Sequence, residues 1–186
     1  MKFFLVMLSL AVGLLFSPPS SYSGEYYIVA EKHLDDGWTT TAYLRNDNNE
    51  FGFCSADRDY AFENDDLSLN LGFLLAEKMF NAVIILLKGP DKRNKIPSQY
   101  DAYITIDDGV RWVVKGEKID ADHLSLGFYL PYEPTLVEEL MKGKLVEFHL
   151  TTVNLWFKFD LKGSKKSLQE LLACGLAGLE FKPNTP

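Results

Sequence analysis

Apolar and polar residues alternate along much of this chain, and the alternation is clearest near its C-terminus. Over residues 155–161, Leu, Phe, Phe and Leu fall on one face and Trp, Lys and Asp on the other, which is the two-residue period of a half-buried β-strand. Gly163 ends this run, Ser164 is a suitable N-cap, and leucines then recur at helical spacing up to Cys174. The stretch predicts a strand, a turn and a short closing helix.

The same alternation predicts a series of antiparallel strands before that unit. The pair Asp108-Gly109 between two alternating runs is the strongest short-range signal of a β-hairpin. A helix is predicted over 134–142, where Pro134 suits the first position and Gly143 ends the pattern. With about ten strands, the predicted fold class is mainly β, an antiparallel β-sandwich with a short C-terminal helix, and a barrel is the alternative. The strands are predicted at 26–33, 38–45, 51–54, 67–73, 82–87, 103–107, 110–114, 124–130, 145–150 and 155–161.

Residues 55–66 combine acidic and aromatic side chains. An EF-hand calcium loop that began at Asp57 would need glycine at its sixth position and glutamate at its twelfth, where the chain has Phe62 and Ser68. That specific motif is therefore absent, and a solvated acidic loop is the favoured interpretation. A looser calcium site is the alternative, and no metal ligand is assigned.

Residues 1–23 have the pattern of a secretory signal peptide. A positive charge at Lys2 precedes an apolar run over 3–16 and a Pro- and Ser-rich exit, with Ser23 as the small residue at the cleavage site. Cleavage there leaves 24–186 as a single domain. Because the apolar run is shorter than the roughly 20 residues that span a bilayer, an uncleaved anchor is the less favoured alternative, and no stable membrane insertion is expected after cleavage.

The charge of the chain bears on its partners. The formal net charge is −7, and loss of Lys2 makes the mature form one unit more negative. Nucleic acids and anionic membrane surfaces reward a basic face, so neither is expected as a partner. A basic patch could form within residues 88–95, but a solvated loop is favoured there.

Cys54 and Cys174 are the two cysteines of the chain. In an exported protein, periplasmic or secreted, two cysteines are most simply one disulfide. Pairing would close a loop of about 120 residues, for which loop-closure entropy predicts about 4–5 kcal/mol of stabilisation, lowered by any strain. Two free thiols are the alternative.

No pattern of catalytic residues stands out. Cys54 could act as a thiolate with His33, His123 or His149 as its base, but the disulfide accounts for both cysteines together. The three histidines have no metal-ligand spacing, and no glycine-rich loop is suited to a phosphate. The sequence therefore predicts no catalytic, metal-binding or cofactor-binding residues.

Aromatic residues make up 13% of the chain. On a sheet face they could form a binding surface for a glycan or a protein, although packing between strands of the core is the favoured interpretation. The candidates are Tyr26, Tyr27, Trp38, Tyr60, Tyr100, Trp112, Tyr129, Tyr132 and Trp156.

The layout of the chain resembles that of a known family. An early Gly37-Trp38 strand is followed by Cys54-Ser55-Ala56, and residues 157–164, Phe-Lys-Phe-Asp-Leu-Lys-Gly-Ser, lead to Cys174. This arrangement resembles the invasion-associated locus B family of bacterial exported proteins. The resemblance implies a β-sandwich fold and an envelope or host-contact role, and it implies no defined reaction.

The predicted function is a non-catalytic binding or structural module of the bacterial envelope, with host interaction as one setting. The first alternative is an inhibitor or accessory subunit that docks on another exported protein through an exposed edge strand or the loop 88–96. The second is a thiol-dependent enzyme that uses Cys54. The identity of the protein or glycan partner is not predicted.

Overall fold

This computed structural model describes residues 26–62, 67–76, 79–88, 96–120 and 124–180. The predicted signal peptide, the loop 89–95 and His123 lie outside the described residues. The elements are β1 (Tyr26–His33), β2 (Trp38–Arg45), β3 (Phe51–Phe62), β4 (Leu67–Ala76), β5 (Met79–Lys88), β6 (Gln99–Ile106), β7 (Arg111–Asp120), β8 (Ser125–Leu130), α1 (Pro134–Lys142), β9 (Leu145–Leu150), the short 3₁₀ turn η3 (Thr151–Val153), β10 (Leu155–Asp160) and α2 (Ser164–Glu180).

The strands form one antiparallel sheet in the order β1-β2-β3-β4-β5-β8-β7-β6-β9-β10. The prediction of a mainly β fold with about ten antiparallel strands and a C-terminal helix is confirmed. A sandwich would divide these strands between two separate sheets, whereas the described strands hydrogen-bond as one continuous sheet.

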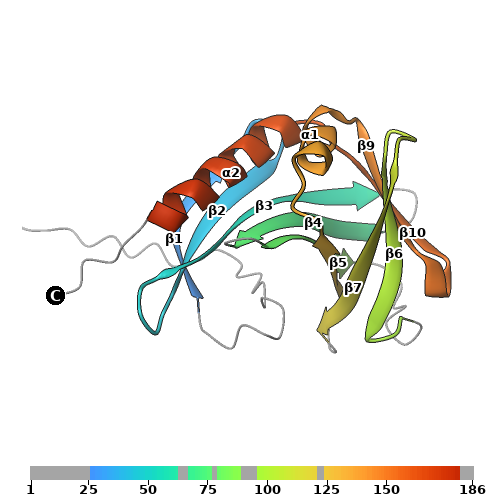
Figure 1. Ribbon diagram of the computed structural model, residues 1–186, viewed down its shortest axis with the longest axis horizontal. Helices are drawn as coiled ribbons and strands as arrows, with labels where there is room; N and C mark the ends of the chain where they lie inside the picture. Colours follow the sequence, from blue (N-terminus) through green and yellow to red (C-terminus); the bar gives the residue numbers. More distant parts are fainter. Residues whose placement is uncertain (1–25, 63–66, 77–78, 89–95, 121–123, 181–186) are drawn as a thin grey trace, which may run out of the picture.

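The sheet curls so that the inner faces of its two halves meet (Figure 1). β3 is third and β10 last in the strand order, yet the ring centroids of Tyr60 on β3 and Phe159 on β10 are 5.0 Å apart. Phe148 on β9 continues this contact, 6.1 Å from Phe159 and 4.8 Å from Phe128 on β8. One apolar core therefore collects the inward side chains of both halves.

Two helices complete this core on the inner side of the sheet. Figure 1 shows α2 lying along β2 and β3, and its Leu168 and Leu171 are buried. The structure extends α2 from Ser164 to Glu180, beyond the predicted end at Cys174. Ser164 is the first residue of α2, and its hydroxyl donates to the carbonyl of Leu140 in α1 at 2.8 Å.

Side chains from β2 and β3 hold the end of β10. The Tyr60 hydroxyl donates to the Asp160 carbonyl at 2.7 Å, and the Trp38 indole donates to the Lys162 carbonyl at 2.9 Å. The Arg58 guanidinium reaches the Asp160 carboxylate and the Lys162 carbonyl, both at 3.0 Å. These bonds join residues that are 100–124 positions apart in the sequence and that no strand pairing connects.

The loop predicted over 55–66 is wrong in its described part. β3 continues to Phe62 and pairs with β4 along that length, so the acidic residues are strand residues. Alternation explains this arrangement, because Ala56 and Tyr60 face the core while Asp57 and Asp59 face outward. Residues 63–66 lie outside the described residues.

No helix within the described ranges is long and apolar enough to cross a membrane.

Candidate functional site

Cys54 and Cys174 form a disulfide in the structure, with Cα atoms 6.2 Å apart. Cys54 lies on the inner face of β3 and is fully buried, and α2 carries Cys174 down onto that strand. Neither cysteine is free. A thiolate at Cys54, which the thiol-enzyme alternative requires, would therefore need reduction of this bond first.

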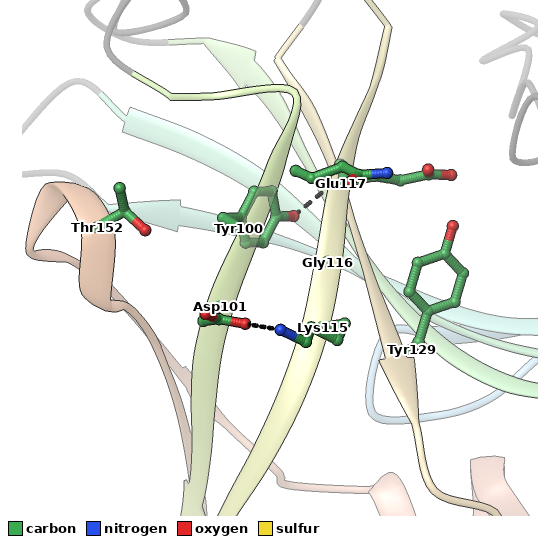
Figure 2. Close-up of a pocket in the computed structure, with 8 residues that line it drawn as sticks. Tyr100, Asp101, Lys115, Gly116, Glu117, Tyr129 and Thr152 are labelled. Atoms are coloured by element: carbon green, nitrogen blue, oxygen red, sulfur yellow. Dashed lines mark hydrogen bonds and ion pairs between the residues drawn. The ribbon is translucent and has the colours of Figure 1, made fainter.

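A pocket of about 430 Å³ opens on the outer face of the sheet, which is the face opposite to the core and the two helices (Figure 1). Figure 2 shows the side chains that line it. It lies across β6, β7 and β8, with η3 at its rim, and we call it the outer-face pocket. Its lining is mostly polar and includes both charge signs. The lining residues are Gln99, Tyr100, Asp101, Lys115, Gly116, Glu117, Tyr129 and Thr152.

Strand register brings the charged residues of the pocket together. Lys115 on β7 lies opposite Asp101 on β6 and, on its other side, opposite Tyr129 on β8. The Lys115 ammonium and the Asp101 carboxylate form an ion pair across the strands. Glu117 follows two residues after Lys115 on the same face, opposite Gln99. One row of side chains therefore crosses three strands.

Gly116 forms part of the floor of the pocket, and its lack of a side chain leaves room for the Tyr100 ring against it. A Cβ at this position would lie 2.2 Å from the ring of Tyr100 and 2.6 Å from the carbonyl oxygen of Gly127. The Tyr100 ring lies against the glycine, and its hydroxyl, which has one proton to donate, lies 2.9 Å from the carbonyl oxygen of Gly127 and 3.2 Å from that of Glu117. Burial raises the pKa of this hydroxyl, so it remains a donor that joins β6, β7 and β8.

Tyr129 forms an exposed wall of the pocket, with 43% of its surface accessible. Burial, hydrogen bonding to Glu117 and the negative charge of Glu117 raise the pKa of its hydroxyl to about 12. The hydroxyl is therefore protonated at neutral pH and donates toward the Glu117 carboxylate. The pocket offers a ligand one aromatic surface with hydrogen-bonding groups around it.

Beside the pocket, aromatic rings line up across β6, β9 and β10, and we call them the ring row. Tyr103 lies two residues after Asp101 on the same face and opposite His149, which lies opposite Trp156. The His149 and Trp156 rings stack with centroids 3.8 Å apart, and the Arg111 guanidinium lies 4.9 Å from the Tyr103 ring centre. Trp156 on edge strand β10 is 45% exposed, so the indole at the end of the row is accessible to solvent.

The aromatic residues named from the sequence include some that are buried in the structure and some that are exposed. Trp38, Tyr60 and Tyr100 are buried, which confirms core packing for these three. Tyr129 and Trp156 are exposed on the outer face beside the pocket and in the ring row. Tyr103, which the sequence did not single out, belongs with them because its register places it between Val113 and His149.

The histidines considered as catalytic bases or metal ligands lie apart from one another in the described structure. His33 bonds Thr39 at 3.0 Å on β1 and β2, whereas His149 bonds Asn154 at 3.1 Å. In the part of the chain that the structure describes, no three His, Cys, Asp or Glu side chains group to hold a metal ion. The basic patch considered within 88–95 falls almost wholly outside the described residues.

Comparison with known proteins gives one distant likeness in structure. No known protein family matches the chain, and no curated protein matches it in sequence. The fold is similar to the crystal structure of invasion associated protein B from Bartonella henselae, with 12% identity and a TM-score of 0.47 over 79% of this chain and 96% of that chain. A likeness this remote carries no argument about family or function, so the resemblance drawn from the sequence motifs stays a prediction.

Proposed function

We propose that this protein is an exported, non-catalytic binding module of the bacterial envelope that holds a glycan on its outer face. The observation that carries the proposal is the outer-face pocket of about 430 Å³ with the ring row beside it. Both helices pack on the inner side, so this face is left to contact a ligand.

The chemistry of the pocket favours a glycan over a flat protein surface. A sugar ring has one apolar face, which packs against an aromatic ring, and hydroxyls at its rim that need both donors and acceptors. Tyr129 supplies the aromatic surface, while Lys115 supplies a donor and Asp101 an acceptor. Hydrogen bonds to such charged groups are stronger than hydrogen bonds between neutral groups. The pocket is also concave, as small-ligand sites are, whereas protein–protein interfaces are broad.

A glycan array tests the proposal. The oxidised protein is applied to immobilised bacterial and host glycans, together with Tyr129→Ala and Trp156→Ala. We expect at least one glycan to be retained, with a loss of roughly tenfold or more in Tyr129→Ala because its aromatic contact contributes about 1.5 kcal/mol. Ile28→Ala is the control, because Ile28 is 54% exposed on β1, at the opposite edge of the sheet. Equal binding by Tyr129→Ala, or no retained glycan at all, would contradict the proposal.

Export is supported by the disulfide and by the predicted signal peptide. Disulfides persist in oxidising compartments outside the cytosol. Intact mass of the protein from its native envelope, alkylated with and without prior reduction, tests this part separately. We expect a mass that corresponds to cleavage after Ser23 and two alkylated thiols only after reduction. An uncleaved chain or free thiols in the native sample would exclude it.

A second candidate is the accessory subunit that docks through an edge strand. β10 is the last strand of the sheet, and Leu161 N–H bonds the Lys144 carbonyl of the β9 side. By antiparallel alternation, the backbone groups of Trp156 and Lys158 point to the open side, where an extended partner segment could pair. Co-purification of a stoichiometric protein partner from the native envelope would favour this candidate over the glycan-binding module.

A further inference from the structure

Arg111 lies on the outer face of β7, on the side of the ring row away from the outer-face pocket. Successive side chains of a strand alternate between its faces, so Arg111, Val113 and Lys115 point outward together. Val113 lies opposite Tyr103 of the ring row, and Lys115 lies opposite Asp101 in the pocket. The outward side chains of β7 therefore lead from the pocket, past the ring row, to a guanidinium.

The Arg111 guanidinium is positioned by an aromatic ring but is bound to no anion. Its Cζ atom lies 4.9 Å from the centre of the Tyr103 ring, a cation–π contact that favours one position of this long side chain. In the part of the chain that the structure describes, no carboxylate pairs with Arg111. The side chain is exposed, so two of its N–H groups can reach the two oxygens of one ligand carboxylate.

The charges beside Arg111 leave its positive charge unbalanced. The outward carboxylates in the neighbouring register positions are already paired, Asp101 with Lys115 and Glu147 with Lys158. A sugar carboxylate carries a single negative charge, whereas a phosphate monoester carries about 1.5 to 2. A carboxylate therefore matches the charge that this surface has to offer.

Glu117 places a negative charge at the far end of the same row of β7 side chains. Its carboxylate bonds the Tyr129 hydroxyl, and among the described residues no cation pairs with it. Residues 111 and 117 lie on one strand, a separation of about 20 Å at the usual rise per residue. An anionic group is thus attracted near Arg111 and repelled near Glu117, which fixes the direction of a charged ligand.

We infer that the ligand of this face is an oligosaccharide with one carboxylate-bearing sugar, and that Arg111 binds this carboxylate. The inference rests on the proposed glycan-binding function and names the class of glycan. The acidic sugar lies at the ring row and a neutral sugar fills the outer-face pocket; these two rows of side chains are about 7 Å apart. The net charge of −7 disfavours a polyanion with a charge on every sugar.

A glycan array printed with matched pairs tests the inference. Oligosaccharides that end in sialic acid or in glucuronic acid are printed beside their carboxyl-reduced forms, in which a hydroxymethyl group replaces the carboxylate, and beside sulfated oligosaccharides. We expect the oxidised parent protein to bind the acidic member of at least one pair about tenfold more tightly than the reduced member, because reduction removes the charge-assisted hydrogen bonds to Arg111.

Variants decide whether Arg111 is the group that recognises the carboxylate. Arg111→Ala should lower the affinity ratio of acidic to reduced glycan from about tenfold to about one. Arg111→Lys should keep roughly threefold, because lysine retains the charge but not the paired donors of the guanidinium. Arg45→Ala is the matched control and should keep the ratio of the parent, because Arg45 lies on β2 and pairs with Asp47.

The outcomes separate this inference from the proposed function. Glycans retained with equal affinity in acidic and reduced form would overturn the inference and leave glycan binding standing, whereas no retained glycan would overturn both. A ratio preserved in Arg111→Ala would place the carboxylate elsewhere, and equal binding of sulfated glycans would show that charge alone is recognised. Either result would also overturn the inference.

Discussion

The two faces of the curled sheet differ in what they contribute. The inner face is an apolar core closed by two helices and a disulfide, and its side chains have few polar atoms that could serve a ligand. The outer face carries the pocket and the ring row over β6 to β10, and a small apolar cluster of Phe53, Leu74 and Val83 over β3 to β5. The difference teaches that, over β6 to β10, core packing and ligand contact are separated by side-chain direction and not by region of the chain.

A single strand shows this separation. On β3, Cys54, Ala56 and Tyr60 point into the core, while Asp57 and Asp59 point outward to Asn70. Because successive side chains alternate between faces, substitutions one residue apart should have different consequences.

The largest effect is expected at Phe148. Its ring is 1% exposed and contacts Phe128 and Phe159, so Phe148→Ala should lower the free energy of unfolding by about 3–5 kcal/mol through lost burial and a cavity. His149→Ala, one residue later, removes only an outer-face ring contact and should cost about 1 kcal/mol or less. Urea denaturation measures both. Equal losses would show that the faces do not differ as described.

The disulfide should come next. The double variant Cys54→Ala/Cys174→Ala removes a cross-link over 120 residues and should lower the free energy of unfolding by about 2–4 kcal/mol, below the entropic limit. A reducing agent should lower the melting temperature of the parent protein and leave the double variant unchanged. A parent protein insensitive to reductant would show that the cysteines are not paired in solution.

A smaller effect, of opposite sign, is expected at Asp57. The pKa of this carboxyl rises in the folded protein from 3.8 to about 6, so folding binds a proton between these values and the free energy of unfolding falls as pH rises through that window. Asp57→Asn removes this penalty and should stabilise the protein by about 2 kcal/mol at pH 8, with little difference at pH 3.5.

Chemical denaturation at both pH values measures this effect of Asp57→Asn. Asp101→Asn serves as its control, because that carboxylate is exposed and paired with Lys115. An equal gain at both pH values would assign the effect to packing and not to the charge of Asp57.

Hydrophobic period, together with turn and capping residues, was sufficient to predict most of the strands and both helices. The predicted helix 134–142 has the bounds of α1, and the Asp108-Gly109 turn does join β6 to β7. The prediction failed at 55–62. The acidic composition there suggested a solvent-exposed loop, although the alternation of a strand continues through Asp57 and Asp59. Acidic residues are tolerated there because Asp59 is exposed and the partly buried Asp57 accepts hydrogen bonds from Ser55 and Asn70.

The curl of the sheet and the outer-face pocket could not be predicted in this way. Lys115 meets Asp101 through a hairpin that the Asp108-Gly109 turn specifies, but it meets Tyr129 through the pairing of β7 with β8, whose register no turn signal specifies. Gly116 gave no signal on its own, because the Tyr100 ring that excludes a Cβ there is known only from three-dimensional contact. A local sequence pattern predicts the side-chain period of one strand, whereas a site depends on the register between several strands.

The position of the disulfide also sets the order of events during synthesis. Cys54 and Cys174 are 120 residues apart, and a ribosome that adds 5–20 residues per second needs on the order of 6–24 s to make that interval. During this time Cys54 has no partner within its own chain. The covalent closure of the fold must therefore wait until the helix that carries Cys174 has emerged.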